Sequence, residues 1–344
     1  MKLRSGIWRW LRGVDVGAPG TLMRAFLVPG AVLYGMAMLL RRRIRKPVRA
    51  AVPVVSVGNL ELGGTGKSPC VRWLALRLME RGVRVLVVSR GYGARVQSGL
   101  DEEGAELAAH GVRVAQGRAR AALIASALQT AQADLVLLDD GFQQLDVAVD
   151  CHILLLDAQR PFGAGWTLPA GSLRECPMLV PSPHFIVLTR TDAVDASTLQ
   201  ASRRCVERRF PDVPILHGRQ VVMSEGGSAG AGLAGRRVHL LAGIARPEEF
   251  QRLSTAEGAE VTGTTFMPDH HAWSAGEVRA AAEQGRAEGA EVLLTTGKDL
   301  PKVAGCATAI PLHVLRVGFE LEDGDVAALD AALAARIQGK GPPD

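Results

Sequence analysis

At 344 residues, 47% of them apolar, the chain is long enough for about two domains with buried cores, which excludes an intrinsically disordered protein. Its net charge of +5 is unevenly distributed: residues 1–49 hold eleven Lys or Arg against one acid and carry +10, so residues 50–344 carry −5. A mildly acidic body behind a basic leader argues against a general nucleic-acid binder and favours an N-terminus that meets anionic lipid. The five cysteines are scattered and never in CxxC spacing, which predicts reduced cytosolic thiols and neither a disulfide framework nor a zinc site.

The first predicted element is an apolar helix over residues 25–40 (AFLVPGAVLYGMAMLL), preceded by Arg24 and followed by the basic block RRRIRK at 41–46. Its 16 uncharged residues fall short of the roughly 20 that a full membrane span prefers, and Pro29 would kink it. Without a small-residue cleavage site after it, the segment is not a signal peptide. We expect residues 1–49 to be a membrane-associated segment, spanning or interfacial, with its basic block on the cytoplasmic side; a buried core helix is the alternative.

The next stretch, residues 53–68 (PVVSVGNLELGGTGKS), has the pattern of a phosphate-binding loop. A short β-branched run at 54–57 predicts a buried strand, and a helical pattern follows Pro69. Between them, loop N–H groups and the helix N-terminus would surround a nucleoside triphosphate, with Lys67 on its β- and γ-phosphates and the Ser68 hydroxyl on Mg²⁺. Glu61 stands where the strict motif has glycine. The predicted nucleotide-binding residues of this loop are Gly63, Gly64, Thr65, Gly66, Lys67 and Ser68.

A second nucleotide element follows an apolar strand at 135–138, where Asp139 and Asp140 form a carboxylate pair. Behind a phosphate-binding loop such a pair holds Mg²⁺ directly or through water. Further apolar runs with intervening helical patterns predict that residues 50–216 form a P-loop NTPase-type αβα sandwich, with ligands at the carboxyl ends of its strands. These further predicted strands lie at 84–89, 112–115, 153–156 and 185–188.

A second, smaller α/β domain is expected over residues 217–344, with strands at 238–242 and 291–296 and a helix at 275–289. Residues 266–273 (FMPDHHAW) place two adjacent histidines after an acid. By themselves these histidines fit a surface pair, half of a metal site, or a catalytic group.

The order of motifs resembles the tetraacyldisaccharide 4′-kinase family, the lipid A kinases of Gram-negative bacteria. The resemblance rests on VGNLELGGTGKSP, SRGYG, LDDGFQQ, LPAGSLRE, AGIARPEEF, FMPDHHAW and TTGKD, in this order behind a hydrophobic, basic segment. It implies transfer of the γ-phosphoryl group of ATP to the 4′-hydroxyl of a tetraacylated glucosamine disaccharide 1-phosphate, at the cytoplasmic face of the inner membrane. Because the acyl chains of that acceptor cannot leave the bilayer cheaply, the enzyme must go to the lipid.

The resemblance also implies a catalytic pair. The family's Gly-Asp-Glu-Pro motif best matches residues 100–103, which puts its catalytic carboxylate on Asp101, with Leu100 in place of Gly and Glu103 in place of Pro. Glu102 is the competing residue for this role. Asp101 would pair with His270, or with its neighbour His271, and take the acceptor hydroxyl's proton.

Other family positions near the nucleotide or the closed cleft fall on Arg90, Tyr92, Arg120 and Glu175, whereas Gln144 replaces a family histidine. Since His270 belongs to the second portion, the resemblance implies that this domain closes over the active site to complete the pair.

Three rival functions remain at the level of sequence. A dimerising P-loop ATPase of the partition or metal-delivery kind shares GGxGK[ST] but carries Lys before the two glycines, where this chain has Leu62. A GTPase is faintly suggested by Thr-Arg-Thr-Asp at 189–192, which has Arg where the guanine-reading motif has Lys. A non-catalytic membrane tether leaves the nucleotide motifs unexplained.

Overall fold

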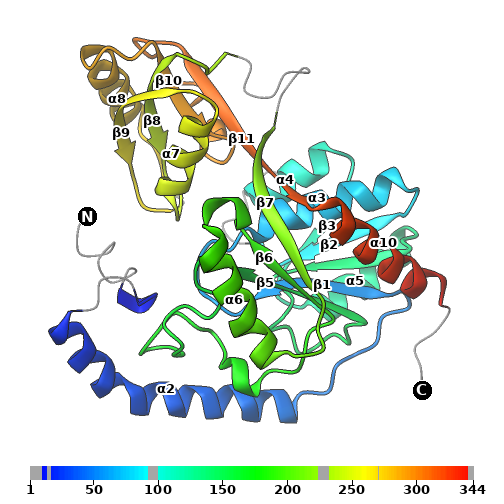
Figure 1. The fold of residues 1–344 in the computed structure, drawn as a ribbon. Coiled ribbons are helices and arrows are strands. Elements are labelled where there is room, and N and C mark those ends of the chain that lie inside the picture. Colours follow the sequence, from blue (N-terminus) through cyan, green and yellow to red (C-terminus); the bar gives the residue numbers. More distant parts are fainter. Residues whose placement is uncertain (1–9, 14–16, 92–99, 224–231, 270, 340–344) are drawn as a thin grey trace. The chain divides into compact units, whose positions relative to one another are not determined.

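The computed structural model describes residues 10–13, 17–91, 100–223, 232–269 and 271–339 (Figure 1). The chain divides into two compact units. Unit 1 consists of Met1–Arg219 together with Glu320–Asp344, and unit 2 is Gln220–Phe319. Unit 1 is therefore discontinuous in sequence, and unit 2 is one continuous insertion into it.

Unit 1 is built on a parallel sheet in the strand order β3-β2-β4-β1-β5-β6-β7. Its inner strands are buried on both faces, which is why they read as continuous apolar runs in the sequence. Val57 lies opposite Asp139, the last residue of β4, and Asn59, the last residue of β1, lies opposite Leu155 of β5, so the carboxyl ends of these three parallel strands lie at one edge. The strands are β1 (Val54–Asn59), β2 (Val85–Ser89), β3 (Arg113–Gln116), β4 (Leu135–Asp139), β5 (Cys151–Asp157), β6 (Phe185–Thr189) and β7 (Ile215–Met223).

Helices cover the sheet of unit 1. Ile124 packs with the even-numbered side chains of β1, β2 and β4, and Val206 packs with those of β5 and β6. The P-loop helix packs against β1, β2 and β4. The predicted αβα class with a P-loop is confirmed. Besides the N-terminal helix, the described part of unit 1 contains α3 (Lys67–Glu80), α4 (Glu102–Ala109), α5 (Arg120–Thr130), α6 (Ala196–Arg209) and α10 (Asp323–Gln338), with short 3-10 turns η1 (Pro177–Leu179) and η2 (Thr191–Ala193).

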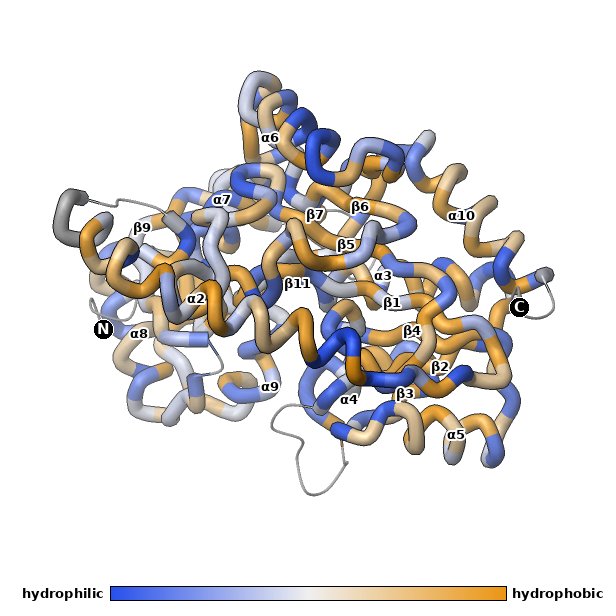
Figure 2. Tube along the Cα trace, turned by 90° about the horizontal axis from the view of Figure 1, so that it is seen from below, coloured by the Kyte–Doolittle hydropathy of each residue, from blue (hydrophilic) through white to orange (hydrophobic). Residues whose placement is uncertain are grey.

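The N-terminal helix α2 (Ala18–Ile44) contains the predicted apolar segment and extends beyond it in both directions, with Pro29 inside. Residues 20–44 are long and apolar enough to cross a membrane, and only 11% of their most apolar window is buried against protein, which argues against a core helix. Figure 2 shows α2 hydrophobic along most of its length and hydrophilic near its basic end. Its packed side uses small residues, Ala31 and Gly35.

Unit 2 has its own parallel sheet in the order β11-β10-β8-β9. One cluster, around Leu240 and Phe250, covers one side of it, and another, around Leu241 and Trp273, covers the other. Its elements are β8 (Arg237–Ala242), α7 (Pro247–Ala256), β9 (Glu260–Phe266), α8 (Ala275–Ala287), β10 (Val292–Thr296), α9 (Leu300–Val303) and most of β11 (Leu312–Leu321).

The extent of the second unit differs from the expected 217–344. Strand β7 leaves unit 1 at Arg219, and β11 returns to it at Glu320, where the two side chains form a 2.9 Å ion pair. Helix α10, which follows β11, belongs to unit 1 again, and its buried Asp330 accepts hydrogen bonds from Arg77 of α3. No local pattern in the sequence marks the point at which the chain re-enters unit 1.

Candidate active site

The predicted phosphate-binding loop lies where β1 runs into α3. Gly66 caps α3 in the left-handed conformation, at φ 84°, and Gly63 has φ 95°, a region that side chains with a Cβ rarely adopt. Asn59, the last residue of β1, donates to the buried Thr65 hydroxyl at 2.8 Å and to the Glu61 carbonyl at 2.8 Å. The loop is thus ordered by its own side chains, with the N-terminal N–H groups of α3 at its end.

Lys67 begins α3 and is mostly buried. Its ammonium donates to Asn59 Oδ1 at 3.2 Å and lies 3.6 Å from Asp140 Oδ1. Burial lowers the pKa of Lys67, while the charge of Asp140 opposes that shift. The structure therefore brings the loop lysine and the predicted carboxylate pair together.

The two carboxylates have opposite electrostatic environments. Burial, together with the negative charge of Glu103, raises the pKa of Asp139 to about 7. Burial also disfavours ionised Asp140, but the charges of Lys67 and Arg174 outweigh it and hold the pKa of Asp140 below its usual value. Asp140 has φ 52°, so the chain turns sharply directly after β4.

The carboxylate pair fits a divalent cation. Oδ1 of Asp139 and Oδ1 of Asp140 are buried, and neither has a hydrogen-bond partner among the described residues. Oδ1 of Asp140 faces the Lys67 ammonium at 3.6 Å. A buried carboxylate oxygen without a partner, such as Oδ1 of Asp139, is costly unless a cation binds it, and hard oxygen ligands suit Mg²⁺. Ser68, the third predicted ligand, is the second residue of α3.

Two of the predicted nucleotide-binding residues lie at strand or helix ends of unit 1. Arg120, buried at the start of α5, donates to the Asp140 carbonyl at 3.1 Å. Arg90 is exposed just after β2. Tyr92 lies outside the described residues.

Asp101 is the N-cap of α4. Its Oδ1 accepts hydrogen bonds from the Gly104 N–H at 2.8 Å and from Gln116 Nε2 at 2.7 Å. The Asp101 N–H in turn donates to Gln116 Oε1 at 2.7 Å. Gln116 also donates to Ser89 Oγ at 2.7 Å, so the carboxylate is oriented from the ends of β2 and β3. Its predicted partner His270 lies outside the described residues and belongs to unit 2. The pairing stays a prediction.

Glu103 stands where the family motif has proline, and its charge acts on Asp139 and Lys67. Its charge raises the pKa of Asp139 and favours protonated Lys67. Glu102 is the first residue of α4, one position before it. The signal available in the sequence was the three consecutive acids at 101–103.

The segment of residues 163–175, which we call the bracket loop, joins the phosphate-binding loop to the carboxylates. Backbone bonds run from Leu62 N–H to the Ser172 carbonyl at 2.8 Å and from Arg174 N–H to the Leu60 carbonyl at 2.7 Å. The Ser172 hydroxyl donates to Glu61 at 2.6 Å, so the residue that replaces the motif's glycine is buried as an anchor for this loop. Arg174 was not singled out in the sequence.

Arg174 donates to Asp140 Oδ2 at 2.6 Å, and its neighbour Glu175 faces a different partner. Glu175 is buried and binds the Arg42 guanidinium of α2 through both oxygens, at 2.8 and 2.6 Å. Gln143 donates to Glu175 at 3.4 Å and to the Asn59 carbonyl at 2.9 Å. In this structure Glu175 therefore joins α2 to the carboxylate turn; its predicted contact with nucleotide stays a prediction.

Another contact to the phosphate-binding loop comes from Arg190, which the sequence singled out only as part of a GTPase-like pattern. Its guanidinium lies 2.6 Å from the buried Asp157 carboxylate and donates to the Gly64 carbonyl at 3.3 Å. Asp157 also binds Arg12 at 2.8 Å.

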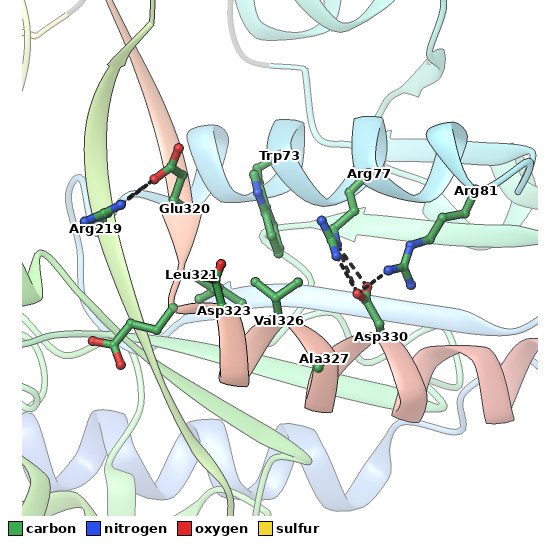
Figure 3. A pocket seen from close by; sticks show the side chains of 11 residues that line it. Trp73, Arg77, Arg81, Arg219, Glu320, Leu321, Asp323, Val326, Ala327 and Asp330 are labelled. Atoms are coloured by element: carbon green, nitrogen blue, oxygen red, sulfur yellow. Dashed lines mark hydrogen bonds and ion pairs between the residues drawn. The ribbon is translucent and has the colours of Figure 1, made fainter. Parts of the chain in front are cut away.

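A pocket of about 870 Å³ lies between α3 and α10, and none of the predicted site residues lines it (Figure 3). Arg77 of α3 and Arg81, which directly follows α3, both bind Asp330 of α10 there, each at 2.6 Å, and the Arg77 guanidinium lies over the Trp73 ring. These contacts hold the far end of the P-loop helix.

Comparisons with known proteins agree with this geometry. The profile of the family described as tetraacyldisaccharide-1-P 4′-kinase matches residues 23–338. The tetraacyldisaccharide 4′-kinase of Anaeromyxobacter sp. (strain K) is 40% identical, over 96% of this chain and 94% of that one, and that of Geobacter sulfurreducens is 35% identical, over 96% and 98%. A crystal structure of LpxK from Aquifex aeolicus in complex with ATP superposes with a TM-score of 0.69 at 25% identity, covering 92% of this chain and 99% of that one.

Proposed function

Since the chain belongs to the tetraacyldisaccharide-1-P 4′-kinase family, we propose how its described residues carry out the reaction of that family. The reaction is transfer of the γ-phosphoryl group of ATP to the 4′-hydroxyl of tetraacyldisaccharide 1-phosphate, a step of lipid A synthesis. One observation supports the assignment most directly: Lys67 of the phosphate-binding loop lies 3.6 Å from the carboxylate of Asp140, at the carboxyl ends of adjacent strands. Lysine and paired carboxylates in this arrangement are the usual parts of phosphoryl transfer.

ATP is bound by the loop of residues 63–68. The loop N–H groups and the N-terminus of α3 take the phosphates, and Lys67 neutralises the β- and γ-phosphate charge. Arg120, already fixed on the Asp140 carbonyl, and Arg90, exposed at the end of β2, are proposed to contact the nucleotide. Their positive charge offsets the charge that spreads over the transferring group.

Mg²⁺ is proposed to lie on Ser68, Asp139 and Asp140. When bound, it neutralises phosphate charge and orients the transferring group. Asp139 supplies an unpartnered oxygen, Asp140 supplies an oxygen that faces the Lys67 ammonium, and Arg174 holds the other oxygen of Asp140 in place.

Asp101 is proposed as the general base that takes the proton of the 4′-hydroxyl, with Glu102 as the competing residue. Its carboxylate is held by Gly104 and Gln116, which fixes its orientation. His270, or His271, would stabilise it when unit 2 closes over the cleft. Such closure would also exclude water, to which the phosphoryl group could otherwise be lost.

Helix α2 is proposed to hold the enzyme at the cytoplasmic face of the inner membrane, where its lipid acceptor lies. Large apolar side chains on α2 are exposed, among them Phe26 at 83% and Leu33 at 65%. Basic residues follow them in the last turn, where anionic headgroups attract them. The partners are thus ATP, the acylated disaccharide and the membrane surface, and not a nucleic acid.

The test is a transfer assay with γ-labelled ATP or GTP, Mg²⁺ and detergent-dispersed tetraacyldisaccharide 1-phosphate. Lys67→Ala serves as the blank. We expect label on the lipid with ATP and wild-type protein, and almost none with the variant. ATP hydrolysis without lipid labelling would instead favour the P-loop ATPase.

A further inference from the structure

Arg42 differs from the other basic residues of the block at 41–46, because it binds the buried Glu175. We propose that Arg42 is a positioning residue for the nucleotide site, which fixes Glu175 and the turn after Asp140 from the membrane helix. This inference rests on the proposed function, because it assigns to α2 a part in the turnover of that site besides lipid attachment.

Arg42 donates three hydrogen bonds. Its Nε donates to Glu175 Oε1 at 2.8 Å, and its Nη2 donates to Glu175 Oε2 at 2.6 Å and to the Phe142 carbonyl at 3.0 Å. The side chain of Arg42 is 15% exposed and that of Glu175 is 3% exposed. A two-pronged charged pair that is shielded from water fixes both orientation and distance. The guanidinium also lies over the Phe142 ring, 5.5 Å from its centroid.

From Phe142 the contact continues to the phosphate-binding strand. Phe142 follows Asp140 by two residues, and its backbone N lies 2.8 Å from where a Cβ on Gly58 of β1 would be. The turn thus lies directly against the backbone of β1. A shift of Phe142 toward β1 would displace the end of that strand.

From Glu175 the contact continues along the bracket loop. The preceding residue, Arg174, binds Asp140 Oδ2, and Gln143 joins Glu175 to the Asn59 carbonyl. The route through Glu175 thus reaches Asp140 and Asn59, which both contact the Lys67 ammonium, and the route through Phe142 reaches Gly58, the residue before Asn59.

The neighbours of Arg42 lack this arrangement. Arg41 and Arg43 are exposed, and Arg45 forms only an exposed pair with Asp146, at 3.2 Å. Arg43 thus provides a matched control, since its substitution removes the same charge from the same turn of the helix.

The experiment compares Arg42→Gln, Arg42→Lys and Arg43→Gln for kcat, for KM of both substrates and for partitioning onto anionic vesicles. We expect Arg42→Gln to lower kcat at least tenfold, while its lipid KM and vesicle partitioning match those of Arg43→Gln. Arg42→Lys should recover only part of kcat, because one ammonium cannot bind both carboxylate oxygens and the Phe142 carbonyl in the same way. Equal kcat for Arg42→Gln and Arg43→Gln would overturn the proposal.

A double-mutant cycle with Glu175→Gln separates positioning from general stability. If Arg42 acts through Glu175, Arg42→Gln should reduce kcat by less than threefold in the Glu175→Gln background. The same tenfold or greater loss in that background would reject the route through Glu175.

A second readout keeps this inference separate from the proposed reaction. If the wild-type protein labels no lipid, the affinities of the same variants for a fluorescent ATP analogue are compared. Weaker binding by Arg42→Gln than by Arg43→Gln, at matched thermal unfolding midpoints, still supports the positioning role, and equal affinities refute it.

Discussion

The Lys67 ammonium lies 3.6 Å from the Asp140 carboxylate, whereas burial raises the pKa of the adjacent Asp139 to about 7. The cations of the protein therefore outweigh burial at Asp140 but not at Asp139. This asymmetry predicts opposite effects of equivalent substitutions on stability.

Replacing Asp140 with Asn should destabilise the unliganded protein, because Lys67 and Arg174 would both lose their carboxylate. Breaking such a partly buried network costs about 2–4 kcal/mol. Asp139→Asn should instead stabilise the protein by about 1 kcal/mol, since it removes a buried charge at neutral pH. Chemical denaturation without nucleotide or Mg²⁺ measures both, and equal signs for the two variants would contradict the asymmetry.

Asp101 has a structural role as well as its proposed catalytic one, and two substitutions separate them. Asp101→Asn keeps an N-cap acceptor for Gly104 but cannot take a proton, so we expect kcat to fall by about 10²–10⁴ with little change in unfolding midpoint. Asp101→Ala should lose activity and also about 1 kcal/mol of stability. Glu102→Gln is the matched control. A larger kcat loss in that control than in Asp101→Asn would move the base to Glu102.

Gly58 tests the close approach between β1 and the turn after the carboxylates. A Cβ there would lie 2.6 Å from Phe142 Cβ and 2.8 Å from its backbone N, so Gly58→Ala must displace the turn. We expect a loss of about 1–3 kcal/mol, together with weaker nucleotide binding. Gly324→Ala in α10 meets nothing within 4 Å and should raise helix stability by about 0.5–1 kcal/mol. Equilibrium unfolding and nucleotide titration of both variants would decide the matter.

His152 predicts a component of acid sensitivity. Burial lowers the pKa of His152 to about 4, and the charges of His184 and Arg42 add to this; the Phe142 ring lies edge-on to it. Between that value and the usual 6.5 the unfolded chain binds more protons than the folded one, so stability falls as pH drops from about 6.5 to 4.

The comparison that isolates this component is wild type against His152→Phe, which cannot titrate. We expect wild type to lose about 2–3 kcal/mol more than the variant between pH 7 and 4. Parallel pH profiles of the unfolding free energy would show that His152 is not responsible.

Because α2 exposes large apolar side chains, we expect the protein to bind membranes through them. Phe26→Ser with Leu33→Ser should weaken binding to anionic vesicles by at least about tenfold, since each buried side chain contributes about 1.5–3 kcal/mol. Met178→Ser, at a 75% exposed apolar residue elsewhere in unit 1, is the control. Flotation with vesicles compares the wild type, the double variant and the control, and equal flotation of the double variant and the control would argue against α2 as the anchor.

The elements that could be predicted from the sequence share a local signature. The strand-loop-helix at 54–80 and the strand before Asp139 carry their pattern within a few residues, and buried parallel strands read as apolar runs. Strands β9 and β11 were not predicted, because β9 has no fully buried side chain, β11 mixes buried with partly exposed ones, and the sequences of both mix polar and apolar residues.

The supporting contacts of the site could not be predicted, for a different reason. Arg42 and Glu175 are 133 residues apart, and Arg174 and Asp140 are 34 apart. Contacts between residues so far apart leave no periodic pattern in the sequence. An arginine next to a predicted membrane helix is instead interpreted as a residue that contacts lipid headgroups. Glu61, which stands where the motif has glycine, likewise depends on Ser172, 111 residues away in the sequence, so its role has no local signal.

The discontinuity of unit 1 has a consequence for synthesis on the ribosome. The nucleotide motifs emerge early, but α10, whose Asp330 binds Arg77 and Arg81, is translated only after the whole of unit 2. A nascent chain stopped within unit 2 therefore contains both phosphate-binding loop and carboxylates, while the arginines at the far end of α3 lack their acid. Completion of the kinase unit is in this way delayed until translation has passed through the inserted one.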